Sequence, residues 1–303
     1  MIKYITHNEI DFARWDVCIE QSILPLVYAK SWYLNTICPG WDALVLNDYD
    51  AVMPLTKGKK YFINYLYQPF FTQQLGIFSK QELSAEEQFE FIKSIPQKFK
   101  FIDINLNQSC KLLAENYHLS KRKNYELQLN KSYDKLIKNY SGQTKRNLKK
   151  AASQSLSVIN NSYTETVNFY KKHKGTLTKG VKPWHYQMLL KLLETADVSK
   201  HIISLGAVNN KEELLASAVF ISYHGRLIFV LGTANNKGRD CGAMYAIFDY
   251  LIHQHAATGL ILDFEGSEIP GIARFFKNFG AEKTYYYKLK INRLPLIFKL
   301  FKR

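Results

Sequence analysis

The last third of the chain, from Leu227 to Leu289, constrains the fold more than any other region. Its apolar runs and turn residues predict a strand, a glycine-bearing turn, a helix, a buried strand, a short helix and a closing strand, in that order. Gly238 and Gly242 stand where the first strand gives way to the helix. The first backbone N–H groups of a helix have no partner within it, and glycine lets a ligand approach them closely. We therefore expect an anion-binding turn at this point of the chain.

The first half of the chain shows the same order of elements as the second half. It predicts helices over 8–21, 24–36 and 84–99, and strands over 2–6, 41–47, 51–58, 61–69, 100–107 and 124–130. The second half predicts helices over 132–154 and 242–256, a pair of helices within 163–196, and strands over 155–160, 201–210, 213–225, 226–233, 259–267 and 284–291. A repeat of about 150 residues indicates two copies of one α/β unit that pack side by side. We place the boundary at Asn130, which gives domains 1–130 and 131–303 without a flexible linker.

Composition and charge limit the class of protein. With 303 residues and 47% hydrophobic content, the chain can bury a large core, and its length favours two domains. The net charge of +15 implies a polyanionic partner, an anionic surface or a phosphate-bearing ligand. No apolar run approaches the roughly 20 residues of a membrane span, so we expect a soluble protein with no stable membrane span. The four cysteines lie far apart without metal-ligand spacing, which predicts reduced thiols, no metal and a cytoplasmic location: Cys18, Cys38, Cys110 and Cys241.

Three stretches of the sequence carry a resemblance to a known family. They are YLYQPFFTQQLGIF in the first half, the basic segment SGQTKRNLKKA, and ILDFEGSEIPGIARFFKNFGA near the end. With these, the chain resembles the FemAB superfamily, which is related to the GNAT acyltransferases, over most of its length. The resemblance implies an α+β fold of two tandem GNAT-like (acyl-CoA N-acyltransferase) domains, each with a mixed, splayed central sheet flanked by helices. It also implies transfer of an acyl or aminoacyl group to an amine.

The resemblance leaves more than one donor open. One group of members takes an acyl group from acyl-coenzyme A or an acyl carrier protein. The other resembles peptidoglycan-bridge enzymes, which use aminoacyl-tRNA and often carry a coiled-coil arm, whereas residues 163–196 leave room for ordinary helices only. We therefore expect an N-acyltransferase that uses acyl-coenzyme A or a carrier and a small-molecule or cell-wall-precursor acceptor. The alternatives are tRNA-dependent aminoacyl transfer to a peptidoglycan precursor and a non-catalytic protein that binds an anionic ligand; the oligomeric state is left open.

The resemblance assigns the donor site to the turn after the strand over 226–233. In this family the pyrophosphate of the donor lies over the start of the next helix, where backbone N–H groups and the helix dipole stabilise it. The residues in that place are Gly238, Arg239, Gly242, Ala243 and Met244. Asp240 in the same turn opposes an anion, and the alternative is a capped helix start without a ligand. We expect a bulky residue at position 242 to abolish donor binding and to leave the fold intact.

Acyl transfer to an amine needs a neutral amine and a protonated leaving group. Asp263 and Glu265 are the expected carboxylates, because residues two apart on a strand point to the same side. The alternative is that Asp263 caps a helix or pairs with Arg274. Tyr285 on the closing strand is the expected proton donor to a leaving thiolate, as in other GNAT-like enzymes, and plain packing is its alternative.

The residues expected at the acceptor or carrier are mostly basic or aromatic. On the helix over 132–154, Lys145 and Lys149 stand four residues apart, as do Arg146 and Lys150, which makes one basic face. This face is expected to hold phosphates, with a solvated surface as the alternative, and the forked guanidinium makes Arg146 the strongest candidate. The other expected substrate residues are Tyr67, Gln73 and Trp184. The tail with Lys299, Lys302 and Arg303 is expected to pack back on the first domain.

Overall fold

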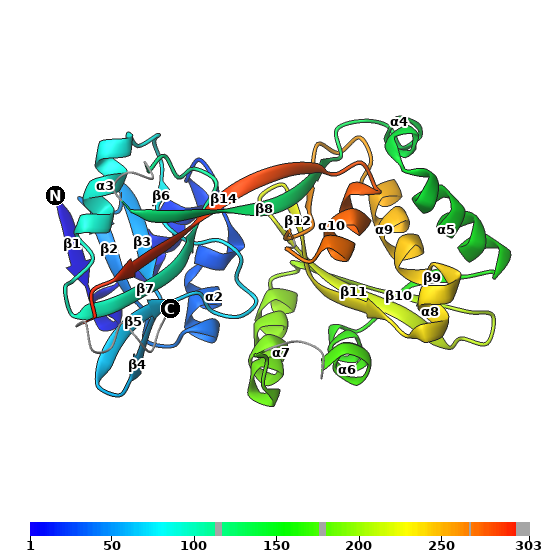
Figure 1. Ribbon diagram of the computed structural model, residues 1–303, viewed down its shortest axis with the longest axis horizontal. Coiled ribbons are helices and arrows are strands. Elements are labelled where there is room, and N and C mark those ends of the chain that lie inside the picture. The colour runs from blue at the N-terminus through cyan, green and yellow to red at the C-terminus, as the bar shows by residue number, and fades with distance from the viewer. Residues whose placement is uncertain (113–116, 176–179, 267, 295–303) are drawn as a thin grey trace. The chain divides into compact units, whose positions relative to one another are not determined.

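The computed structural model describes residues 1–112, 117–175, 180–266 and 268–294. The chain forms two compact units: unit 1 is Met1–Arg122 with the segment from Tyr285 on, and unit 2 is Lys123–Thr284 (Figure 1). This division differs from the predicted boundary after Asn130. The reason is that two long strands, β8 (His118–Gln128) and β14 (Glu282–Asn292), each continue from one unit into the other. The expected packing of the basic tail lies outside the described residues.

Unit 1 is a mixed α+β fold with two groups of paired strands. Its elements are β1 (Ile2–Ile5), α1 (Phe12–Glu20), α2 (Ser31–Ile37), β2 (Asp42–Leu46), β3 (Ala51–Leu55), β4 (Lys57–Lys60), β5 (Ile63–Tyr67), β6 (Phe78–Ser79), α3 (Ala85–Lys93) and β7 (Phe99–Leu106), with parts of β8 and β14. The first group has the order β1-β2-β3-β6 and is antiparallel. The second has the order β4-β5-β7-β14, in which β5 and β7 are parallel and the other pairs antiparallel.

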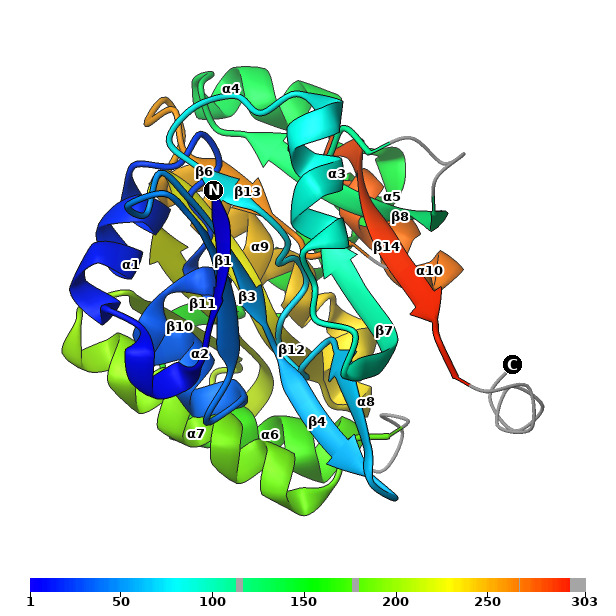
Figure 2. The ribbon, with the colours of Figure 1, turned by 90° about the vertical axis from the view of Figure 1, so that its left-hand side faces the viewer.

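Helix α3 organises the core of unit 1. It begins where the sequence predicts, because Ser84 caps it: the Ser84 hydroxyl accepts a hydrogen bond from the backbone N of Glu87 at 3.2 Å, and the Glu87 carboxylate accepts one from the Ser84 N at 2.8 Å. Phe91 and Ile92 on its buried face pack with apolar residues of β2, β3 and β7. Helices α1 and α2 lie on the opposite side of β1 and β3 from α3 (Figure 2). The β2–β3 hairpin is thus covered on both faces.

Unit 2 contains one open mixed sheet. Its elements are α4 (Tyr133–Leu136), α5 (Gly142–Ser153), β9 (Ser157–Asn160), α6 (Tyr163–Lys174), α7 (Pro183–Val198), β10 (Ile202–Val208), β11 (Leu214–Tyr223), β12 (Arg226–Ala234), α8 (Asn236–Cys241), α9 (Ala243–Gln254), β13 (Ile261–Asp263) and α10 (Pro270–Lys277). The strand order is β8-β13-β12-β11-β10-β9, in which β13 and β12 are parallel and the other pairs antiparallel. Helices α6 and α7 cover one face of this sheet and α9 covers the other (Figure 1).

Several predicted helices differ from the structure. The helix predicted over 8–21 begins only at Phe12, and the one predicted over 84–99 ends at Lys93. The helix predicted over 24–36 begins only at Ser31, because the Asp16 carboxylate accepts hydrogen bonds from the backbone N of Ser31 at 2.8 Å and from its hydroxyl at 2.7 Å. The helix predicted over 132–154 is interrupted at Tyr140, whose backbone is extended. It restarts as α5 because the Ser141 hydroxyl accepts a hydrogen bond from the backbone N of Thr144 at 3.2 Å.

Candidate functional site

The sheet of unit 2 opens between β12 and β13. The two strands pair over three residue pairs only, and the last of these joins Ile228 to Asp263. Strand β12 continues to Ala234, so within the described residues its second half has no partner on that side. On its other side the register with β11 shifts by one residue, which leaves Val230 as a β-bulge. The splayed sheet that the family resemblance implies is therefore present in unit 2.

A cavity of about 510 Å³ lies at this opening. Most of its lining side chains are apolar or aromatic, and they come from β12, α9 and α10: Phe229, Met244, Tyr245, Phe248, Ile272, Phe275 and Phe276. Three basic side chains also line it, namely His173, Lys174 and Arg239. Among its described lining residues there is no carboxylate. An apolar cavity with a few polar groups is the usual form of a small-molecule site.

Two glycines shape the wall of this cavity. Gly242 has a φ of +78°, in the left-handed region, and it joins the end of α8 to the start of α9. A Cβ atom there would lie 2.6 Å from the backbone O of Asn147 in α5, and one at Gly238 would lie 2.1 Å from the backbone O of Leu215. The expectation that a bulky residue at 242 leaves the fold intact is therefore wrong, because such a residue would displace α5.

Four of the five predicted donor residues line the cavity: Gly238, Arg239, Gly242 and Met244. The fifth, Ala243, is fully buried in the first turn of α9. Gly242 has no side chain to cap that helix, and the backbone N–H of Ala243 contacts the Cys241 thiol. The N–H groups of the next residues are of the kind that a helix start offers to an anion. The structure thus brings the predicted donor residues together around one cavity.

The two charged residues of the predicted donor turn face different surroundings. The Arg239 guanidinium donates to the backbone O of Ala234 at 2.7 Å and also to the side chain of Asn236, which holds it against the start of α8. Asp240 lines a separate cavity with Lys150. Asp240 therefore does not line the cavity in which the donor anion is expected, so the repulsion suggested by the sequence does not act within that cavity.

Asp263 lies in a buried ionic network at the base of the splay. Its side chain is almost fully buried, and its carboxylate accepts hydrogen bonds from Arg226 at 2.8 Å, from the side chain of Asn124 at 3.0 Å and from the backbone N of Glu265 at 3.0 Å. Arg226 also donates to Glu126 at 3.0 Å. Burial raises the pKa of Asp263, while Arg226 opposes that rise. The ionic partner is Arg226 and not Arg274, which the alternative interpretation had named. This geometry does not support Asp263 as a base that reaches a substrate.

The other two predicted catalytic residues lie outside the cavity lining. Glu265 follows β13, is partly exposed and has a φ of +54°, so it does not continue the strand as the sequence analysis assumed. Strand alternation therefore does not determine whether Glu265 and Asp263 point to the same side of the sheet. Tyr285 belongs to unit 1, where the Lys121 ammonium lies 3.9 Å from the centre of its ring.

Two predicted acceptor residues are held by neighbouring groups in unit 1. Tyr67 on β5 is half-buried, and burial together with its contact to the Cys38 thiol raises its pKa. Gln73 is buried; its side-chain oxygen accepts a hydrogen bond from Gln74 at 2.7 Å, and its backbone O accepts one from Asn105 at 2.7 Å. These contacts fit a structural turn, which the sequence analysis held as the alternative.

The remaining predicted substrate residues are exposed on helices of unit 2. Lys145, Arg146 and Lys149 lie on α5 and form the expected basic face. Trp184 at the start of α7 is 55% exposed, and the centre of its ring lies 3.6 Å from the centre of the His185 ring. The Nδ1 of His185 accepts a hydrogen bond from the backbone N of Lys182 at 2.7 Å, so this histidine caps α7.

Sequence reasoning missed the aromatic wall of the cavity. Phe229 lies on the strand expected beside the donor, and Tyr245 lies on the helix that follows, yet neither was assigned a role. Ile272, Phe275 and Phe276 stand at helical spacing in the segment that carried the family resemblance. That spacing was a signal for one apolar helix face.

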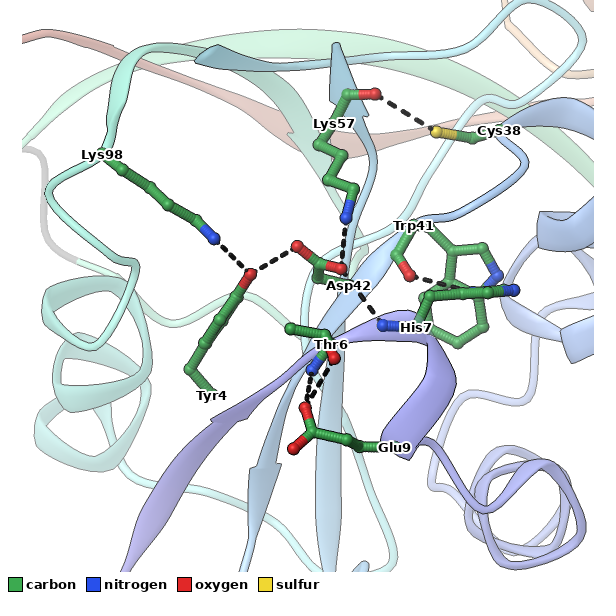
Figure 3. Close-up of polar contacts among 9 residues, drawn as sticks. All are labelled: Tyr4, Thr6, His7, Glu9, Cys38, Trp41, Asp42, Lys57 and Lys98. Atoms are coloured by element: carbon green, nitrogen blue, oxygen red, sulfur yellow. Dashed lines mark hydrogen bonds and ion pairs between the residues drawn. The ribbon is translucent and has the colours of Figure 1, made fainter. Parts of the chain in front are cut away.

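Unit 1 contains a second polar cluster, around the buried carboxylate of Asp42 (Figure 3). It accepts hydrogen bonds from the Tyr4 hydroxyl at 2.5 Å, from the backbone N of His7 at 3.2 Å and from the Lys57 ammonium. Lys98 in turn donates to the Tyr4 hydroxyl at 2.6 Å. Burial and the hydrogen bond to Asp42 raise the pKa of Tyr4. These contacts tie β1, β2 and β4 together.

Over the described ranges, no helix is both long enough and apolar enough to cross a bilayer. In the same part of the chain, no three or more His, Cys, Asp or Glu side chains gather in a way that would hold a metal ion.

No protein-family model matches the sequence, and none of the curated proteins does. Solved structures are similar in fold. FemX has a TM-score of 0.72 at 10% sequence identity, over 99% of this chain and 100% of that one. A tandem GNAT protein from the clavulanic acid biosynthesis pathway has a TM-score of 0.53 at 10% identity, over 97% and 99%. L-PGS from Bacillus licheniformis has a TM-score of 0.53 at 10% identity, over 86% and 87%.

These similarities establish the fold. The chain has an α+β fold similar to those of FemX and of the tandem GNAT protein, which is the fold that the sequence resemblance implied. At identities near 10% the likeness shows the architecture alone, and the chemistry has to be argued from the residues of the cavity.

Proposed function

We propose that this protein is an N-acyltransferase that takes an acyl group from coenzyme A or an acyl carrier and passes it to an amine. The observation that carries the proposal is the cavity at the splay of β12 and β13, which combines an apolar wall with Arg239, Lys174 and the uncapped start of α9. Such a site suits an acyl group on its apolar wall and the phosphates of the donor beside its cations and the start of α9.

In the proposed reaction the amine nitrogen attacks the donor carbonyl, a C–N bond forms and the C–S bond of the thioester breaks. The amine loses one proton and the leaving thiolate gains one. We assign polarisation of the carbonyl to backbone N–H groups of the unpaired half of β12, around the bulge at Val230. The amine proton passes to water, because no carboxylate lines the cavity among its described residues. Most of the rate enhancement then comes from positioning the two substrates.

The donor assignment is tested by isothermal titration with coenzyme A and acetyl-coenzyme A. Arg239→Gln should weaken binding of both about 10- to 150-fold, the worth of a charge-assisted hydrogen bond to phosphate. Lys237→Ala is the matched control, because Lys237 lies on the same helix but pairs with Glu213 and lines the other cavity. Equal affinities for the wild type and the Arg239 variant would remove Arg239 from the donor site, and no binding to the wild type would refute the coenzyme A proposal.

The basic face of α5 favours a second candidate, aminoacyl transfer from tRNA to a cell-wall precursor. Lys145, Arg146, Lys149 and Lys150 are all exposed on this helix in a chain with a net charge of +15. If this face holds phosphates, tRNA affinity should fall steeply with salt, and Arg146→Ala should reduce the slope of log K against log [salt] by about one. Lys191→Ala, on the exposed side of α7, is the control. Tight binding of tRNA without any acyl transfer would instead favour a non-catalytic binding protein.

A further inference from the structure

We infer that the acyl group taken by this cavity is an uncharged, apolar chain larger than acetyl, and not an aminoacyl group. The inference rests on the proposed function, since it assumes that the cavity at the splay is the acyl site. It adds the chemical class of the acyl group, which follows from what lines the cavity and from what does not.

The wall of the cavity is built on a set of contacting aromatic rings, of which Phe248 is fully buried behind the others. The ring centres of Phe229 and Phe248 are 5.2 Å apart, those of Phe248 and Phe275 are 5.4 Å apart, and those of Phe275 and Tyr245 are 4.8 Å apart. The Tyr245 hydroxyl is engaged with Asn278 and Gln143, which do not line the cavity, so Tyr245 contributes its ring to the wall. The partly exposed rings of Phe229, Tyr245 and Phe275 gain free energy when apolar atoms cover them.

The charges around the cavity have one sign. Lys174 and Arg239 line it beside His173, and no Asp or Glu does among the residues described there. Two nearby carboxylates are used elsewhere: Asp263 binds Arg226, and Asp249 accepts a hydrogen bond from Tyr133 at 2.9 Å. The α-ammonium of an aminoacyl group would therefore lose water, find no carboxylate and face like charges.

The same lining suits an apolar group on an anionic carrier. The cations and the start of α9 attract the phosphates of the carrier, whereas the rings accept only the uncharged end of the donor. The volume of about 510 Å³ lies within the range of sites that bury whole small molecules. An acetyl group alone would leave much of this aromatic wall uncovered.

Thioethers of coenzyme A test the inference, because they bind without reacting. From S-ethyl- to S-hexyl-coenzyme A, the dissociation constant measured by isothermal titration should fall about fourfold for each added methylene. S-propyl- and S-(2-aminoethyl)-coenzyme A have nearly the same shape and differ by one charge. The propyl compound should bind on the order of tenfold more tightly, or better.

Variants of α10 complete the test. Ile272→Asp places a carboxylate in the cavity wall and should reverse the preference between the propyl and aminoethyl compounds, whereas Ile272→Asn, of the same size without charge, should not. Ile269→Asp is the control, because Ile269 is 60% exposed at the start of the same helix and does not line the cavity.

The two failures can be told apart. A dissociation constant that does not change with chain length, or wild-type protein that prefers the aminoethyl compound, for example by cation–π contact with the rings, would overturn the inference and leave the donor site standing. If no thioether of any length binds, the proposed coenzyme A site is itself refuted.

Discussion

Replacing Gly242 with alanine tests how tightly the start of α9 packs against α5. The backbone there has a φ of +78°, and an alanine in the left-handed region costs roughly 1–2 kcal/mol. The added Cβ would also lie 2.6 Å from the backbone O of Asn147, closer than a carbon and an oxygen can approach. Since the opposing atom belongs to the backbone of α5, relief requires a shift of a helix, and we expect a further cost of about 1–3 kcal/mol, as in overpacked cores.

Gly259 provides a matched control for this substitution. Its φ is +77°, and a Cβ atom there would meet nothing within 4 Å. Gly259→Ala therefore carries the backbone cost alone, and the difference between the two variants isolates the contact with α5. Urea unfolding followed by circular dichroism gives both free energies. Equal losses of stability in the two variants would refute the reasoning, because they would show that α5 yields without cost.

Three further predictions concern buried polar groups. Asp263→Asn should lower the free energy of unfolding by about 1.5–3 kcal/mol, the contribution of a hydrogen bond to a charged group. The affinity for S-propyl-coenzyme A should stay within about twofold of the wild type. Unchanged stability together with lost binding would show that Asp263 acts in the substrate site. Burial lowers the pKa of His185 below its ordinary value near 6.5, so its contribution to stability is present above that pH and is lost as the pH falls through the lowered pKa. In His185→Gln, the urea midpoint should fall less between pH 7.5 and pH 5 than it does in the wild type. An equal fall would show that His185 does not contribute to the pH dependence of stability. Asp42→Asn should destabilise unit 1 by about 1.5–3 kcal/mol, whereas Asp48→Asn, whose carboxylate is 76% exposed, should stay within about 1 kcal/mol of the wild type; similar losses in both would argue against the buried cluster.

The sequence predicted those elements whose signals are local. The hairpin of β10 and β11 turns at Asn209, whose side-chain oxygen accepts hydrogen bonds from the backbone N of Lys211 and of Glu213, both at 3.0 Å. The cap at Ser84 and the turn at Gly242 likewise lie next to the helices they begin. In each case the residues that decide the conformation are a few positions apart, so a single sequence displays them.

The features that were missed depend on residues far apart in the chain. Helix α2 begins at Ser31 because of Asp16, 15 residues earlier, and Asp263 is held by Arg226, 37 residues earlier. The spacing of Asp263 and Glu265 in the sequence does not indicate that Asp263 is buried against Arg226. The aromatic wall was missed for the same reason, because Phe229 and Phe275 belong to separate elements and meet only in the folded sheet.

The two strands that cross between the units have a consequence for how the protein is made. The last six pairs of β14, from Tyr287 to Asn292, join it to β7, which is synthesised nearly two hundred residues earlier. During synthesis on the ribosome, the edge of β7 that pairs with β14 therefore stays unpaired until the whole of unit 2 has been made. A chain cut short before residue 285 would keep every residue of the cavity and still leave that edge uncovered, which is a ready template for aggregation.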